Sequence, residues 1–333
     1  MQESFKEIFA VIFYLRRFLM KEIQSTQNLS RREFFKTSAT FTLAGVALSS
    51  PMSMFGASVK SGAKMQFSTL NDGRQIPLVG FGTSRMTGAE CQKAVESAFG
   101  VGYRLIDTAQ MYNNESDVGN AIKTALNGKK ITREEMFITT KLSSDMSYDE
   151  TLKATEESLK KLQIDYVDLL LIHKNYKRSK DMYKAMEKLH QEGVIKSLGI
   201  SNFTPDMYNK FIKTCKVIPA VNQMETHIFF QQNALRKAMQ AKGTKLEAWS
   251  PFANGKNDFF KNETLAKLAK KHKKSVAQIA LRFLIEQDII VIPKSAKVER
   301  MKENINIFDF ALDNEDRQIL SALDTNEPFF KWF

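Results

Sequence analysis

A regular alternation of strand-like and helix-like segments extends from residue 65 to the end of the chain. Short apolar runs are separated by longer segments in which apolar residues recur every three to four positions, the spacing of one helix face. Strands that alternate with such helices form βαβ units and a parallel sheet. We expect eight strands, at residues 78–82, 104–107, 136–140, 167–173, 197–201, 220–223, 245–250 and 289–293.

Eight βα units in about 270 residues fit a closed (β/α)8 barrel, the TIM barrel, because doubly wound sheets usually have fewer strands. We therefore predict one α/β domain over residues 65–333, with no Pro- or Ser-rich linker dividing it. The pair Asp72-Gly73 between two alternating runs predicts a β-hairpin over residues 66–76 that plugs the bottom of the barrel. Helices are expected at residues 89–99, 116–126, 148–162, 180–191, 205–214, 232–241 and 276–286, and a last one at 314–323.

The composition is that of a globular protein with a basic balance: 43% of the residues are hydrophobic, 26% are charged and the net charge is +12. No block of basic residues with interleaved aromatics appears, so we expect a soluble basic surface and no nucleic-acid partner. Attraction of a multiply anionic cofactor is the functional alternative. Cys91 and Cys215 lie far apart, and no His or Cys cluster has metal-site spacing, so we expect buried free thiols and no metal.

Residues 1–60 differ from the rest and are expected to form a leader. Arg31-Arg32 precedes a weakly hydrophobic, uncharged stretch whose apolar core, residues 41–48, is too short to span a membrane comfortably. This pattern resembles a twin-arginine export signal, which predicts transport of the folded protein to the periplasm by the Tat machinery. A disordered tail or an uncleaved anchor, with a cytoplasmic barrel, is the alternative. The aromatic and basic stretch before Met20 suggests that translation starts at Met20.

Four polar residues stand at the carboxyl ends of the predicted strands, where the active sites of such barrels lie. Asp107, Lys141 and His173 each end a strand, and Tyr112 lies five residues beyond Asp107. A phenol, with an ordinary pKa of about 10, becomes a useful proton donor beside a positive charge that has its own counter-ion. Lys141 and Asp107 can supply these charges, and His173 can hold a carbonyl oxygen by a hydrogen bond. The four residues predict a proton-transfer site for carbonyl reduction.

Each of the four residues, taken alone, also has a structural explanation. Asp107 can cap a helix, Tyr112 and His173 can pack in a core, and Lys141 can be a surface charge. Their meeting at one rim of the sheet favours catalysis. A non-catalytic barrel that binds NADP and senses redox state, or binds a partner, is the alternative function, although a pure binder does not need all four.

Hydride transfer requires a cofactor, because no side chain supplies a hydride. The Rossmann fingerprint is absent, and Gly80-Phe81-Gly82 is only a fragment of it. A different anion site follows the last strand, where Lys294, Ser295 and Arg300 surround the start of a predicted helix. These cations indicate an extra phosphate on the ribose, hence NADPH rather than NADH; a capped helix with solvated charges is the alternative.

Three stretches of the chain resemble signatures of the aldo-keto reductases: residues 102–119, 196–203 and 292–304. The resemblance covers residues 65–332. It implies an NADP-dependent oxidoreductase acting on CH–OH groups, which reduces aldehydes and ketones with Tyr112 as the proton donor and with Asp107, Lys141 and His173 completing a tetrad. It also implies cofactor contacts from Gly82, Thr83, Ser201, Asn202, Gln223, Trp249, Ser250, Phe252, Lys294, Ser295, Arg300, Glu303 and Asn304.

The resemblance assigns a part of the cofactor to each group of these residues. Ser201, Asn202 and Gln223 would hydrogen-bond the carboxamide, and Trp249 would stack on the nicotinamide. The pyrophosphate would lie near Ser250 and Phe252, the ribose phosphate near Lys294, Ser295 and Arg300, and the adenine near Glu303 and Asn304. Gly82 and Thr83 would approach the cofactor from the first strand.

The chain departs from the best-known members of the family at three points. Trp249 stands where many members have tyrosine, and Lys174 follows His173 where animal members have tryptophan. These features resemble bacterial members related to diketogluconate reductases and to microbial prostaglandin F synthase-like proteins. The short tail after Leu323 predicts an open pocket. We expect a monomer that acts on a small carbonyl substrate.

Overall fold

The computed structural model describes residues 65–129, 131–330 and 332. The predicted leader with Arg31-Arg32 and the proposed start at Met20 lie outside these residues, and both remain predictions. Within the described part of the chain, no helix is long and apolar enough to cross a membrane.

Eight parallel strands form one sheet in the order in which they occur along the chain. The first and last strands also meet: Val79 and Val291 form a parallel bridge, and the Val291 amide donates to the Leu78 carbonyl at 2.9 Å. This contact closes the sheet into the predicted (β/α)8 barrel. The strands are β3 (Gly80–Gly82), β4 (Leu105–Asp107), β5 (Phe137–Leu142), β6 (Val167–Ile172), β7 (Ile195–Ser201), β8 (Val221–Glu225), β9 (Lys245–Trp249) and β10 (Ile290–Val291).

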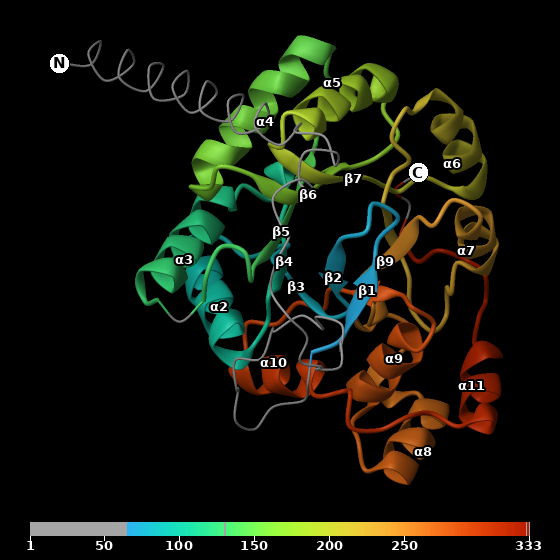
Figure 1. Cartoon of the computed structure of the whole chain (residues 1–333). Helices are drawn as coiled ribbons and strands as arrows, with labels where there is room; N and C mark the ends of the chain where they lie inside the picture. Colours follow the sequence, from blue (N-terminus) through green and yellow to red (C-terminus); the bar gives the residue numbers. More distant parts are fainter. Residues whose placement is uncertain (1–64, 130, 331, 333) are drawn as a thin grey trace, which may run out of the picture. The chain divides into compact units, whose positions relative to one another are not determined.

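Helices surround the sheet, as Figure 1 shows. Capping boxes set the starts of three of them, at Ser147, Ser275 and Asp313. A helix that the sequence argument did not include, α8, lies between β9 and α9. The helices are α2 (Gly88–Val101), α3 (Glu115–Asn127), α4 (Tyr148–Leu162), α5 (Ser179–Gln191), α6 (Pro205–Phe211), α7 (Asn233–Gln240), α8 (Glu263–His272), α9 (Val276–Ile285), α10 (Val298–Ile305) and α11 (Asn314–Ser321).

The predicted hairpin is present as β1 (Phe67–Thr69) and β2 (Gln75–Pro77), which pair antiparallel. Its turn is held by side-chain hydrogen bonds to the beginnings of other strands. Asp72 accepts from the Ser197 hydroxyl at 2.6 Å, and Arg74 pairs with Asp168 at 3.3 Å. Ser197 and Asp168 lie near the starts of β7 and β6, so the hairpin covers the amino-terminal end of the barrel. In Figure 1 it lies across the middle of the ring of strands.

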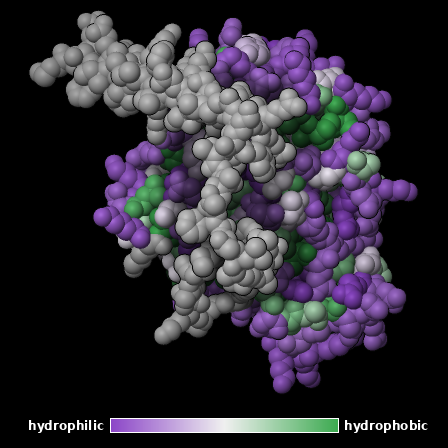
Figure 2. All heavy atoms as spheres, in the orientation of Figure 1, coloured by the Kyte–Doolittle hydropathy of each residue, from purple (hydrophilic) through white to green (hydrophobic). Residues whose placement is uncertain are grey.

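The strands of the barrel are buried on both faces, as expected for a parallel sheet covered by helices. All residues of β5 and β6 are buried, including Lys141 and Asp168. Both cysteines are free thiols; Cys91 is buried and Cys215 is half-buried. The face in Figure 2 is mostly hydrophilic, with hydrophobic residues in small separate areas of the described surface. Charged residues that are buried in these strands, such as Lys141 and Asp168, need an explanation.

Candidate active site

Asp107 and Lys141 form a buried ion pair at the carboxyl ends of two neighbouring strands. Lys141 is fully buried, and its Nζ lies 2.5 Å from Asp107 Oδ1 and 2.9 Å from the Thr108 carbonyl oxygen. Burial is the largest single influence and lowers the pKa of Lys141, but the charge and hydrogen bond of Asp107, together with Tyr112 and Glu247, outweigh it, and the pKa lies above its ordinary value. Lys141 therefore remains a cation at the rim of the barrel.

Tyr112 follows this pair on the short 3-10 helix η1 (Gln110–Tyr112). Its hydroxyl lies 3.4 Å from Lys141 Nζ. Burial raises the pKa of the phenol above its ordinary value, and this effect exceeds the lowering by the charge of Lys141. The effect of Lys141 was expected from the sequence, whereas the larger effect of burial was not. Tyr112 therefore stays protonated at neutral pH, the state in which it can donate a proton.

Two amide side chains hold the loop that carries Tyr112. The Asn114 amide nitrogen donates to the carbonyls of Thr83 and Met86, at 2.9 and 2.8 Å. Gln110 donates to the Ser158 hydroxyl at 3.0 Å, which ties η1 to α4. Neither residue was singled out from the sequence, because a polar side chain in a loop gives no sign of which distant backbone it will meet.

His173 follows β6 and faces Tyr112. The two rings lie edge to face, with centroids 5.8 Å apart and an interplanar angle of 80°. Burial lowers the pKa of His173 to about 3, and the charges of Lys141 and Lys174 add to this effect. The imidazole is therefore neutral at physiological pH, and the structure brings all four predicted tetrad residues together.

The residues predicted to hold the carboxamide lie beside the tetrad. Gln223 Nε2 donates to Asp107 Oδ2 at 2.8 Å, and the Ser201 hydroxyl donates to the Gln223 carbonyl at 2.8 Å. Asn202 donates to the His173 carbonyl at 2.9 Å and accepts from Trp249 Nε1 at 3.0 Å. These hydrogen bonds join five strands, β4, β6, β7, β8 and β9, into one network around Asp107 and His173.

Glu247 is a buried carboxyl that the sequence argument missed. It is fully buried in β9, and its Oε2 accepts from Gln223 Nε2 at 3.1 Å. Burial raises the pKa of Glu247 to about 8, with a further rise from the charge of Asp107. The sequence did contain a sign of this residue. Glu247 is the only carboxylate in its predicted strand, and it lies on the same face of that strand as Trp249.

The predicted phosphate site lies between β10 and α10. Lys294 and Arg300 are exposed, and neither forms an ion pair with any described residue. The Ser295 hydroxyl accepts from the Lys297 amide at 3.0 Å and shapes the turn before the helix. Lys294 and Arg300 thus lie beside the amino-terminal end of α10 without a carboxylate partner among the described residues, and their N–H groups suit a phosphate group.

The remaining predicted cofactor residues have mixed surroundings. The Thr83 hydroxyl and amide both donate to the Asp107 carbonyl at 3.0 Å, and Gly82 lies so close to the Ile292 carbonyl that a Cβ would approach it to 2.8 Å. The Glu303 carboxylate accepts from the Ser275 hydroxyl, so within the protein it already has a partner. Ser250 donates to Asn254, Phe252 packs on Phe259 and Phe260, and Asn304 is buried.

The carboxyl-terminal tail reaches the site, which differs from the expected open pocket. Glu225, fully buried at the end of β8, accepts from the amides of Phe329 and Phe330 at 2.7 and 3.2 Å. The tail continues to Trp332, whose ring stacks on His173 with centroids 6.0 Å apart and an angle of 9°. Although the tail is short, Glu225 directs it over the tetrad, so Trp332 narrows the approach to His173.

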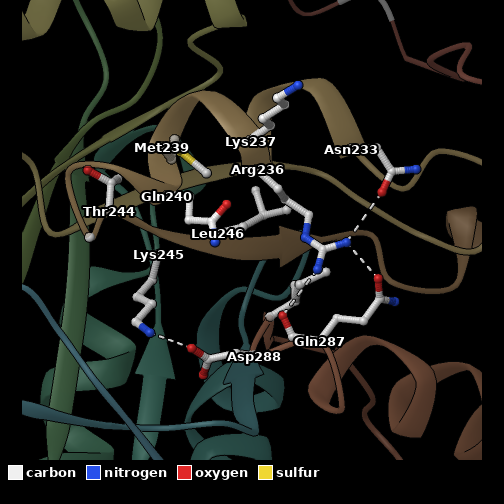
Figure 3. Close-up of a pocket in the computed structure, with 12 residues that line it drawn as sticks. Asn233, Arg236, Lys237, Met239, Gln240, Thr244, Lys245, Leu246, Gln287 and Asp288 are labelled. Atoms are coloured by element: carbon white, nitrogen blue, oxygen red, sulfur yellow. Dashed lines mark hydrogen bonds and ion pairs between the residues drawn. The ribbon is translucent and has the colours of Figure 1, made fainter.

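A separate pocket of about 450 Å³ lies at the other end of the barrel strands (Figure 3). It is lined by the first residues of β9, by α7 and by the loop before β10. Arg236 bonds to Gln287 at 2.6 Å, and Lys245 forms an ion pair with Asp288. Because these two side chains are already paired, the pocket offers no arrangement of groups that could act on a carbonyl. The described residues also contain no group of three potential metal ligands.

Comparison with known proteins identifies relatives of the whole barrel. The glyoxal reductase of Bacillus subtilis is 42% identical over 261 residues, which are 78% of this chain and 92% of that protein. The crystal structure of an aldo/keto reductase from Brucella melitensis is 44% identical with a TM-score of 0.73, and the match covers 78% of this chain and 100% of that one. A Bombyx mori aldo-keto reductase in complex with NADP is 34% identical with a TM-score of 0.76, over 81% of this chain and 96% of that one.

The family model described as the aldo/keto reductase family matches residues 78–325. This match begins just before β3 and ends beyond α11, so it includes every strand of the barrel and all four tetrad residues. The chain therefore belongs to the aldo/keto reductase family.

Proposed function

We propose that this protein reduces aldehydes and ketones to alcohols with NADPH, and that Tyr112 donates the proton. The observation that carries the proposal is the position of the Tyr112 hydroxyl, 3.4 Å from a buried lysine that is paired with Asp107. A phenol in this position is protonated at rest and becomes a stabilised phenolate after donation.

Each tetrad residue has a separate task in the proposed reaction. The cofactor, when bound, supplies the hydride to the carbonyl carbon. Tyr112 transfers its proton to the carbonyl oxygen, and Lys141 stabilises the phenolate that remains. Asp107 keeps Lys141 charged, while neutral His173 donates a hydrogen bond to the same oxygen and orients the carbonyl.

NADPH is proposed as the cofactor because of the cations near α10. Lys294 and Arg300 offer two positive charges that described carboxylates do not neutralise, and a ribose phosphate adds negative charge at that point. The relative from Bombyx mori was crystallised with NADP. Ser201, Asn202, Gln223 and Trp249 would hold the nicotinamide end of the cofactor next to the tetrad.

Small dicarbonyls are the proposed substrate class. The Bacillus subtilis relative is named as a glyoxal reductase. In this chain, Trp332 lies over His173 and its ring centroid is 6.4 Å from that of Trp249, so aromatic side chains restrict the space above the imidazole. A small planar carbonyl compound suits this narrow approach.

The test is NADPH oxidation by the full chain with glyoxal and methylglyoxal as probes. Tyr112→Phe should lower kcat by at least about two orders of magnitude, the scale of general acid catalysis, and should keep NADPH affinity. Tyr148→Phe, at the start of α4 and outside the site, is the matched control and should leave kcat unchanged. Tight NADPH binding without turnover of any carbonyl would favour the non-catalytic, redox-sensing barrel instead.

A further inference from the structure

We infer that Ser143 is a positioning residue that fixes the tautomer and the ring orientation of His173. The inference rests on the proposed function, in which His173 donates a hydrogen bond to the carbonyl oxygen. Ser143 belongs to neither the predicted tetrad nor the predicted cofactor contacts, yet its Oγ lies 2.9 Å from His173 Nδ1.

The two residues are adjacent because they extend neighbouring strands in register. Leu142, the last residue of β5, pairs with Ile172, the last residue of β6. The His173 amide then donates to the Leu142 carbonyl at 3.0 Å, which holds the two chains together one residue further on. Ser143 is therefore fixed beside the imidazole by the sheet itself and not by a free loop.

Three polar atoms surround the Ser143 hydroxyl, which has a single hydrogen to donate. The oxygen accepts from the Met111 amide at 3.3 Å. Two acceptors lie within reach of the hydroxyl hydrogen, His173 Nδ1 at 2.9 Å and the Lys141 carbonyl at 3.3 Å. The 2.9 Å distance fits a hydrogen bond in either direction, and the tautomer of His173 decides which atom donates. We assign the donation to Ser143 because the proposed reaction requires the ring hydrogen on Nε2.

This donation determines which nitrogen of His173 carries a hydrogen. His173 is neutral at physiological pH, because burial lowers its pKa to about 3, so its ring has one N–H. If Nδ1 accepts from Ser143, the hydrogen is on Nε2. No described residue forms a hydrogen bond with Nε2, so this N–H is available to the carbonyl oxygen beside Tyr112.

The other tautomer would work against the reaction. It would present the lone pair of Nε2 to the carbonyl oxygen, which also carries lone pairs, and the hydrogen bond that orients the substrate would be lost. Ser143 thus acts through His173, just as partners that bond the second nitrogen of a histidine control its tautomer in other sites.

Nitrogen-15 NMR of the full chain reads the tautomer directly, because the chain has only four histidines to assign. We expect His173 in the wild-type protein to show Nδ1 as an acceptor and Nε2 as the protonated nitrogen. Ser143→Thr keeps the hydroxyl and should keep this pattern. Ser143→Ala should lose the fixed pattern, and its kcat for methylglyoxal should fall about tenfold, the lower end of the effect of removing a partner that orients a histidine.

The exposed neighbour Ser144 supplies the matched control, and Ser144→Ala should change neither the spectrum nor kcat. The NADPH affinity of every variant should equal that of the wild type, since Ser143 is not among the predicted cofactor contacts.

Two results would overturn the inference. One is a wild-type spectrum with the hydrogen on Nδ1, and the other is a Ser143→Ala variant that keeps the wild-type tautomer and kcat. If Ser143→Ala does not fold, the spectra of the wild type and of Ser143→Thr decide. A wild-type protein without turnover would count against the proposed function, while the spectrum would still test the role of Ser143.

Discussion

At the scale of single residues, the buried carboxyl of Glu247 makes the stability of the folded protein depend on pH. The carboxyl is buried, accepts from Gln223 and has a pKa raised to about 8 by burial and by the charge of Asp107. In the unfolded chain a glutamate has a pKa of about 4.3. Between these two values the folded protein holds a proton that the unfolded chain releases, so the free energy of unfolding falls as pH rises through this range.

Glu247→Gln should remove this loss of stability. Glutamine resembles the protonated carboxyl and cannot ionise, so we expect a melting temperature at least about 2 °C above that of the wild type at pH 8 and a smaller difference at pH 5. Thermal unfolding between pH 5 and pH 9 provides the measurement. Glu157→Gln, an exposed change on α4, is the control. Melting temperatures of Glu247→Gln and the wild type that change in parallel with pH would contradict this account.

The tetrad was accessible from the sequence, because strand ends are recognisable and the chemistry of Tyr112 and Lys141 is specific. The partners that control these residues were not. Ser143, Asn114 and Glu225 act through contacts whose partners lie far away in the sequence, and a single polar residue carries no local sign of such a contact. Burial also decided the sign of the pKa shift of Tyr112, and burial depends on the whole fold.

At the scale of secondary-structure elements, α10 and the loop before it should determine the preference for NADPH. Replacement of Lys294 or Arg300 by alanine should weaken NADPH binding at least about tenfold, the effect of one lost charged hydrogen bond, and should change NADH binding little. Fluorescence titration with both cofactors measures this. Lys302→Ala, in the last turn of α10, is the control. An equal loss of affinity for NADPH and NADH would mean that these cations do not recognise the ribose phosphate.

The elements themselves were largely predictable. Short apolar runs predicted the eight strands, and the helix starts expected at residues 148 and 314 agree with the capped helices that begin after Ser147 and Asp313. Helix α8 was missed, although Asn262 caps it and Leu265 and Leu268 form its buried face. The reason is that a βα unit leads one to expect a single helix, whereas two helices, α8 and α9, occupy the connection from β9 to β10.

At the scale of the whole molecule, Glu225 fastens the end of the chain to the barrel. Its carboxylate accepts from the amides of Phe329 and Phe330, and His227 Nε2 lies 3.0 Å away. Glu225→Gln replaces one acceptor oxygen by an NH2 group that faces donors, the backbone amides of Phe329 and Phe330. These buried groups then lack a hydrogen-bond partner, which should cost about 1 to 3 kcal/mol. The tail should then separate from the site.

Hydrogen exchange of the carboxyl-terminal peptide is the measurement that identifies this release. The amides of Phe329 and Phe330 should exchange faster in Glu225→Gln than in the wild type, and bulkier carbonyl substrates should bind with a lower KM. Glu327→Gln, an exposed change in the same tail, should exchange like the wild type. Unchanged exchange in Glu225→Gln would mean that other contacts hold the tail, such as the bond from Lys256 to the Phe329 carbonyl at 2.7 Å.

The bridge between Val79 and Val291 has a consequence for how the protein is synthesised. The first barrel strand, β3, emerges early, but β10, which closes the barrel beside it, is among the last segments to leave the ribosome. Until then the growing sheet has two open edges, and unpaired backbone groups on such edges invite aggregation. The edge that stays open throughout, β3, is only three residues long. The edge at β3 therefore exposes few backbone groups until β10 closes the barrel.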